Sequence, residues 1–174
     1  MERDATHTLP ADLRDFFTIS EVDDAHFLAG ALFRRKFAAP PPDAGRHLVA
    51  LYRDPAGSLH VAGYSHMRRF GEVYLSGGSC SEGATIRAMT PAHRDAIQAA
   101  GGVWYLVLKY AFERYADCCD AFFGHCGDRR ALEVATAAGF VAAGPEHLIV
   151  HWHKPLHPVI RRALIAKVEA LGPF

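Results

Sequence analysis

The sequence QAAGGVWYLVLKYAFERY, residues 98–115, places two adjacent glycines before a run of six apolar residues, Val103 to Leu108. Glycine is unfavourable inside a helix and well tolerated at its ends, so the pair predicts a junction between two elements. The segment after the junction has few β-branched residues and is too long for a strand, so residues 102–116 are predicted to form a helix. Because the first half of that helix is apolar all round, we expect its N-terminal end to be buried against a sheet.

Before the junction, the sequence indicates a strand, a helix and an antiparallel meander. Residues 15–19 have the composition of a strand, and Ser20 is placed to cap a helix that runs to about Ala38. One face of this helix, which we expect to be buried, carries Phe27, Leu28, Ala31 and Leu32. Three further strands, separated by glycine-containing turns, are predicted at 47–53, 59–67 and 72–76.

The third strand of the meander runs into Gly77 and Gly78, followed by Ser79 and Cys80. Glycines inside a strand commonly mark a bulge or the close approach of a ligand. The alternative is that the strand ends at the glycines, and both interpretations remain open at this stage.

The elements around the junction are predicted from their caps and periodicity. Thr90 suits an N-cap followed by a first-turn proline, and the helix it starts would end at Gly101. In this interpretation Gly101 is only a C-cap, and Gly102 is the entry to the next helix, where alanine would be tolerated. After the junction helix we expect a strand at 121–126, a helix capped by Asp128, an alternating strand at 147–153, and an amphipathic helix at 158–171 aligning Ile160, Leu164, Val168 and Leu171.

Composition excludes several classes of partner. The chain has 174 residues, half of them hydrophobic, which suits one domain. The chain has 19 lysine and arginine residues and 19 aspartate and glutamate residues, so its net charge is near zero. It therefore has no strong electrostatic field that would favour binding to nucleic acid or to an anionic membrane surface. The N-terminal segment is charged and lacks an apolar signal region, and no apolar run reaches the roughly 20 residues of a membrane span, so we expect a soluble, cytoplasmic protein. The four cysteines, which form no C-x-x-C pair and are expected to be reduced, are Cys80, Cys118, Cys119 and Cys126.

The order of the elements, with a glycine-rich junction between meander and apolar helix, resembles that of the GNAT superfamily of acyl-CoA N-acyltransferases over roughly residues 15–153. The phosphate loop of the superfamily reads Q/R-x-x-G-x-G/A, and Gln98 and Gly101 match its first two fixed positions while Val103 misses the third. The later helix of such proteins often reads N-x-x-A-x-x-x-Y-x-x-x-G-F, and its fixed positions are occupied here by Asp128, Ala131, Ala135, Gly139 and Phe140.

The resemblance implies an α+β fold with a mixed, mostly antiparallel central sheet and helices on both faces. Residues 1–174 would form a single domain, in which 154–174 is a C-terminal helical extension. It also implies acetyl-CoA, or another acyl-CoA, as cosubstrate. The pyrophosphate would lie against the junction, because a helix N-terminus preceded by glycine offers free N–H donors and the positive end of the helix dipole.

The pantetheine arm would run beside the strand that carries the glycine pair, where a bulge could free N–H groups to stabilise an oxyanion. The residues predicted on this basis to bind the cofactor are Gly77, Gly78, Ser79, Cys80, Gln98, Gly101, Gly102, Val103, Trp104 and Asp128.

Two departures from the superfamily pattern bear on activity. Fifteen residues, 83–97, separate Glu82 from Gln98, where the superfamily needs only a few, and they are expected to form an extra helix. The tyrosine that often protonates the departing thiolate is replaced by Ala135, but a thiol of ordinary pKa about 8.5 leaves as an anion with little acid help. The resemblance therefore implies an N-acyltransferase for an unidentified amine of a small molecule or protein, or alternatively a GNAT-like protein that binds acyl-CoA or another ligand without turnover.

A base is needed for transfer, since an ammonium substrate must lose a proton before it attacks a thioester. Glu82, just past the glycine pair, is the first candidate, followed by Glu72 and His66. Each could alternatively be an ordinary polar residue at the surface or at a strand edge. Cys80 could act as a nucleophile, although a free cysteine in a strand is more often a small core hydrophobe.

The histidines of the last strand raise a different class of function. In the GNAT sheet order this strand lies beside the one at 121–126, so His147, His151 and His153 would approach His125 or Cys126, and H-x-H on one strand face can ligate a divalent ion. Such spacing is common without metal, so we expect no metal and keep a metal-binding module as a third alternative. The tail helix is expected to dock on its own domain, or to pair with a second subunit in a homodimer.

Overall fold

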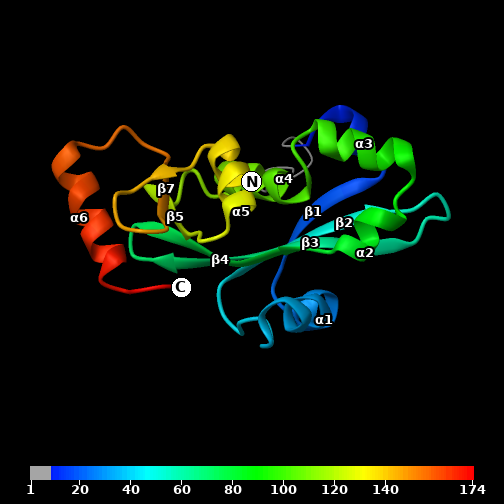
Figure 1. Cartoon of the computed structure of the whole chain (residues 1–174), viewed down its shortest axis with the longest axis horizontal. Helices are drawn as coiled ribbons and strands as arrows, with labels where there is room; N and C mark the ends of the chain where they lie inside the picture. Colours follow the sequence, from blue (N-terminus) through cyan, green and yellow to red (C-terminus); the bar gives the residue numbers. More distant parts are fainter. Residues whose placement is uncertain (1–8) are drawn as a thin grey trace.

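The computed structural model describes residues 9–174 and shows an α+β protein built on one mixed, mostly antiparallel sheet (Figure 1). Residues 1–8, on which part of the expectation of a cytoplasmic protein rests, lie outside this range. The sheet order in the described range is β1-β2-β3-β4-β5-β7-β6. The strands are β1 Phe17–Val22, β2 Arg46–Arg53, β3 Leu59–Phe70, β4 Val73–Ser81, β5 Ala121–His125, β6 Val141–Ala142 and β7 Leu148–Trp152. The helices are a 3-10 turn η2 Ala11–Leu13, α1 His26–Phe37, α2 Gly83–Ala88, α3 Pro91–Ala99, α4 Val103–Arg114, α5 Arg129–Ala138 and α6 Pro158–Glu169.

Strand pairing fixes the position of the parallel junction in the sheet. β2, β3 and β4 form the predicted antiparallel meander, and β1 extends it at one edge. β4 then pairs with β5 in parallel, from Val73 opposite Ala121 to Ser76 opposite Gly124. β7 lies antiparallel beside β5, as expected for the last long strand.

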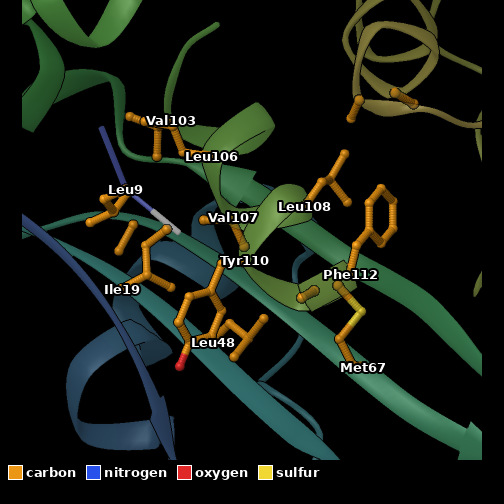
Figure 2. Packing of buried hydrophobic residues seen from close by; sticks show 14 of the residues in the cluster. Leu9, Ile19, Leu48, Met67, Val103, Leu106, Val107, Leu108, Tyr110 and Phe112 are labelled. Carbon is orange, nitrogen blue, oxygen red and sulfur yellow. The ribbon is translucent and has the colours of Figure 1, made fainter. Parts of the chain in front are cut away.

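Helices cover both faces of the sheet (Figure 1). On the face we call the α4 face, the apolar side of α4 packs over the strands, and Figure 2 shows Leu48 and Met67 beneath it. On the other face, called the α1 face, α1 packs over Tyr64 and α6 packs over Leu75. Since side chains alternate along a strand, each residue of β4 and β5 can be assigned to one face.

The helix predicted after β1 begins later than expected. Ser20 does not cap it but lies inside β1, because the chain keeps pairing with β2 as far as Val22 opposite His47. α1 starts at His26 without a side-chain cap. The predicted buried face was wrong for Phe27, which is 93% exposed, and for Ala31, because the face that meets the sheet carries Ala25, Ala29, Leu32 and Phe33.

Most other predicted elements are confirmed. Thr90 caps α3 and Asp128 caps α5 through their side chains. The inserted segment contains two helices, α2 and α3, where one was expected. In α6, Leu164 and Val168 are buried on the chain's own sheet, whereas Ile160 is 48% exposed and Leu171 is exposed as well. No helix among residues 9–174 is long and apolar enough to cross a membrane.

Candidate functional site

A cavity of about 320 Å³ opens where β4 and β5 stop pairing. The parallel ladder ends at Ser76 opposite Gly124, while β4 runs on to Ser81 beside β3. Ligands commonly bind beyond the carboxyl ends of parallel strands, where neighbouring connections diverge. The cavity is lined by Phe37, Ser76, Gly77, Gly78, Ser79, Trp104, Gly124, His125, Cys126, Gly127, Asp128, Ala131, Phe140, Ile149 and Phe174.

The wall formed by β4 contains a β-bulge. Cys80 lies opposite Tyr64 and Gly77 opposite His66, so Gly78 and Ser79 together face the single residue between them on β3. Gly78 has φ +61°, and a Cβ there would lie 2.7 Å from the Phe33 ring. The predicted bulge is therefore confirmed, and the alternative that the strand ends at the glycines is wrong.

The glycines of the junction are occupied by helix capping. The N–H of Gly101 donates to the carbonyl of Gln98 at 3.0 Å, and that of Gly102 donates to the carbonyl of Ile97 at 2.8 Å. These two bonds form a Schellman motif that ends α3. The C-cap interpretation of Gly101 is thus confirmed. Gly102 is not a mere helix entry, because it closes this motif and caps α4 with φ +90° and ψ 166°, a conformation that favours glycine.

The first turn of α4 reaches the cavity through Trp104, whereas Gly101, Gly102 and Val103 are not among the lining residues. Its initial N–H groups, at Val103, Trp104 and Tyr105, have no partners within the helix, and Gly102 supplies no side-chain cap. The indole of Trp104 lines the cavity, and its buried Nε1 has no hydrogen-bond partner among residues 9–174. Because an unsatisfied buried donor is costly, a ligand acceptor that paired with this N–H would remove that cost.

Several predicted binding residues do reach the cavity. Gly77, Gly78 and Ser79 line it from β4, and Asp128 lines it from the start of α5, where its Oδ1 accepts a hydrogen bond from Ala131 N at 2.7 Å. Ser79 Oγ lies 2.6 Å from the hydroxyl oxygen of the buried Ser65 on β3. The bulge and the start of α5 thus meet at one site, as the sequence suggested.

Other predicted binding residues lie away from the cavity. Cys80 packs against the apolar residues between α1 and the sheet, and burial raises the pKa of its thiol to about 11, which agrees with a core role. Val103, the first residue of α4, is buried against β3, where a Cβ added at Gly63 would meet it. Gln98 is exposed on α3. Ala135, which the resemblance aligns with the tyrosine of the GNAT superfamily, is buried in the α4-face core.

None of the three candidate bases lines the cavity in the described chain. Glu82 caps α2 through Ala84 N and forms an ion pair with Arg35. Glu72 lies at the β3–β4 turn, where a 2.6 Å hydrogen bond from Lys167 lowers the pKa of its carboxyl. His66 is buried with its Nε2 2.7 Å from the carbonyl oxygen of Ala44, and burial lowers its pKa.

The histidines in and beside β7 divide into two groups. His147 faces His125 with ring centroids 5.8 Å apart. His151 stacks on Phe112 at 3.9 Å, and His153 lies edge-on to the same ring, at the far end of the strand. Among residues 9–174, no three His, Cys, Asp or Glu side chains are grouped so as to hold a metal ion.

Sequence reasoning missed three cavity residues that come from distant elements. Phe37 ends α1, His125 ends β5, and Phe174 follows α6, with the His125 and Phe174 rings 6.3 Å apart. His125 could have been found from its position, because it directly follows the last residue of the parallel ladder. Nothing in the sequence signals that the tail returns to β4.

In comparisons with known protein families and with curated proteins, the sequence matches no family and no individual protein. The chemistry that the chain supports is therefore inferred from the cavity itself.

Proposed function

We propose that the protein is an acyl-CoA-dependent N-acyltransferase of GNAT type, and that the cavity between β4 and β5 holds the acyl-CoA. The observation that carries the proposal is the meeting of three features at one cavity: the open ends of two parallel strands, a bulge in β4, and the N-terminus of α4. The position of β7 beside β5 agrees with the GNAT sheet order.

The residues present fit a coenzyme A molecule. The positive end of α4 and its free N–H groups suit the pyrophosphate, although Gly101 and Gly102 are already engaged in capping. The orphan N–H of Trp104 suits an amide carbonyl of the pantetheine arm. Because residues 77 and 78 are glycines, this part of the β4 wall has no side chains. The cavity volume of about 320 Å³ lies within the range of small-ligand sites.

The bulge provides the electrostatic part of the chemistry. A bulge leaves a residue unpaired in the ladder, so an N–H within Gly77–Ser79 can face the thioester carbonyl. As an amine attacks, that carbonyl oxygen gains negative charge, which a positioned N–H stabilises. The thiolate can leave without a tyrosine, because a thiol of pKa about 8.5 is a good leaving group near neutral pH.

A second candidate function is ligand binding without turnover. It is favoured by Phe174, whose main-chain carbon and oxygen lie 3.4 Å from where a Cβ of Gly77 would stand. The tail thus covers the α1 face of the cavity beside the bulge, on the side opposite α4. If the tail stays in this position and leaves no room beside Phe174, an acceptor amine cannot reach the thioester from the α1 face.

Calorimetric titration of the full chain with acetyl-CoA tests the proposal, with dephospho-CoA and pantetheine as matched probes. We expect submillimolar binding of acetyl-CoA, and weaker binding as phosphates are removed. Thiol release would then be measured with arylalkyl, alkyl and polyamine acceptors. Absence of binding at millimolar acetyl-CoA would overturn both candidate functions for this ligand, whereas binding without thiol release for any amine would favour the non-catalytic one.

A further inference from the structure

The cavity has two sides, which correspond to the two faces of the sheet. Trp104, Asp128 and Phe140 line it from the α4 face. On β5, Phe122 packs into the core of the α4 face and Phe123 packs under α6 on the α1 face, so alternation places the side chain of His125 on the α1 face. Phe37 and Phe174 line the cavity from that same α1 face.

This two-sided arrangement separates the reactants. If acyl-CoA is held at the N-terminus of α4, which rests on the proposed function, its thioester reaches the β4 bulge from the α4 face. The amine must then approach the carbonyl from the α1 face. The groups that it meets there are Phe37, His125 and Phe174.

We propose that His125 is the catalytic base that takes the proton from the acceptor ammonium group. Gly124 is the last β5 residue in the parallel ladder, opposite Ser76, so His125 and Gly77 stand next to each other across the open part of the cavity. Histidine is the side chain best suited to exchange a proton near neutral pH. Glu82, the candidate from sequence, is held outside the cavity by Arg35.

The surroundings of His125 contain few other charges. The titratable groups near it are His147, whose Nε2 lies 3.5 Å from a carboxylate oxygen of Glu146, and Cys126 and Asp128, which also line the cavity. In the described chain, Asp128 has the one side-chain carboxylate among the lining residues, and it caps α5. Phe37 and Phe174 are aromatic, so the α1 side suits an amine on an apolar or aromatic body better than a polyamine.

In the proposed reaction the acetyl group passes from sulfur to nitrogen, and every proton and electron pair is accounted for. One imidazole nitrogen of His125 accepts a proton from the ammonium group, and the freed nitrogen lone pair forms a bond to the thioester carbonyl carbon. The tetrahedral intermediate then collapses, the C–S bond breaks, and the sulfur leaves with the electron pair. The amide nitrogen gives up its second proton and the thiolate takes one, so one proton is released overall.

The test measures thiol release from acetyl-CoA with 2-phenylethylamine as acceptor, using the full chain and its His125→Gln variant. Spermidine serves as the comparison amine, and His147→Asn is the matched control. Asparagine suits position 147 because His147 has φ +62°, which asparagine tolerates. Acetyl-CoA binding is measured by calorimetry for all three proteins, so that loss of cofactor binding is distinguished from loss of proton transfer.

We expect His125→Gln to bind acetyl-CoA within about twofold of wild type and to lose about 100-fold in kcat at pH 7, as is typical for a general base. Its remaining rate should rise nearly tenfold per pH unit between pH 7 and 9, because only free amine from solution can react. Imidazole added to His125→Ala should restore activity at least tenfold. His147→Asn should retain its rate within about threefold.

An unchanged kcat in His125→Gln, or a loss of the same size in His147→Asn, would overturn the assignment of the base while leaving the N-acyltransferase proposal intact. Faster turnover of spermidine than of 2-phenylethylamine would overturn the inferred acceptor class. Failure of the wild-type chain to bind acetyl-CoA would instead overturn the proposed function.

Discussion

The N–H of Gly102 donates to the carbonyl of Ile97 at 2.8 Å, and this bond ties the end of α3 to the start of α4. Gly101 makes the companion bond to Gln98, and both glycines have φ near +100°. The inserted α3 therefore ends directly before α4, whose second residue, Trp104, lines the cavity. The glycine pair is needed for this geometry whether or not a ligand binds.

We predict that Gly101→Ala and Gly102→Ala each lower the free energy of unfolding by about 1–3 kcal/mol, because a side chain is strained at positive φ. Gly101→Ala should cost more, since its Cβ would lie 2.5 Å from the Tyr105 ring, whereas Gly102 faces open space. Urea denaturation measures both. Gly77→Ala is the control, because its Cβ would meet only ordinary contacts and its φ is not positive. A Gly102→Ala variant as stable as wild type would show that the junction relaxes.

We predict that Glu82→Gln leaves kcat within about twofold of wild type. Glutamine can still accept from Ala84 N and cap α2, and the lost ion pair with Arg35 is partly exposed, so the stability loss should be under about 1 kcal/mol. Arg35→Gln breaks the same pair from the other side and should have a similar effect on stability. A drop of 100-fold in kcat for Glu82→Gln alone would restore this residue as the base.

Local signals in the sequence predicted much of the fold. Thr90 and Asp128 cap their helices because a cap is decided by a few neighbouring residues, and the glycines of β4 mark the bulge for the same reason. Ser20 was misassigned because its environment is set by pairing with Val49 of β2 across the sheet, which overrides the local capping signal.

The candidate site was only half predictable. Gly77, Gly78 and Asp128 belong to short sequence patterns that can be recognised locally. His125 and Phe174 become neighbours only because β5 pairs in parallel with β4 and the C-terminal tail returns to the sheet. Glu82 was chosen because it follows the bulge in sequence. The chain continues along β4 and starts α2 there, which places the carboxylate at the far end of the strand.

We predict that stability falls as the pH is lowered below about 6.5. Burial lowers the pKa of His153 to about 4, and His151 and Lys154 act in the same direction. The unfolded chain therefore takes up the proton first, so the stability from neutral His153 is complete above about pH 6.5 and is lost as the pH falls toward 4. Between pH 7 and 5 this residue should account for at most about 2 kcal/mol.

His153→Phe tests this dependence, because phenylalanine keeps the contacts with Phe112 and Phe122 and removes the buried Nε2 that lacks a partner in the described structure. Urea midpoints at pH 7 and pH 5 should differ less in the variant than in wild type. Some dependence should remain, because burial also lowers the pKa values of His47, His66 and His151. An identical pH dependence in both proteins would contradict the assignment.

The last prediction concerns Trp104, which lines the cavity and whose buried indole N–H has no partner in the described structure. Phenylalanine at this position keeps an aromatic ring and removes the donor. If this N–H donates a hydrogen bond to the ligand, Trp104→Phe should weaken acetyl-CoA binding about fivefold to tenfold. That loss corresponds to roughly 1–1.4 kcal/mol of binding free energy, the usual size of one hydrogen bond. The free protein should lose little stability, because the lost ring area is offset by the removal of an unsatisfied donor.

Calorimetric titration and urea denaturation of the same samples separate the effect on binding from the effect on stability. A variant that binds acetyl-CoA as tightly as wild type would show that the indole N–H does not contact the ligand, and a large stability loss would show that Trp104 is mainly a packing residue.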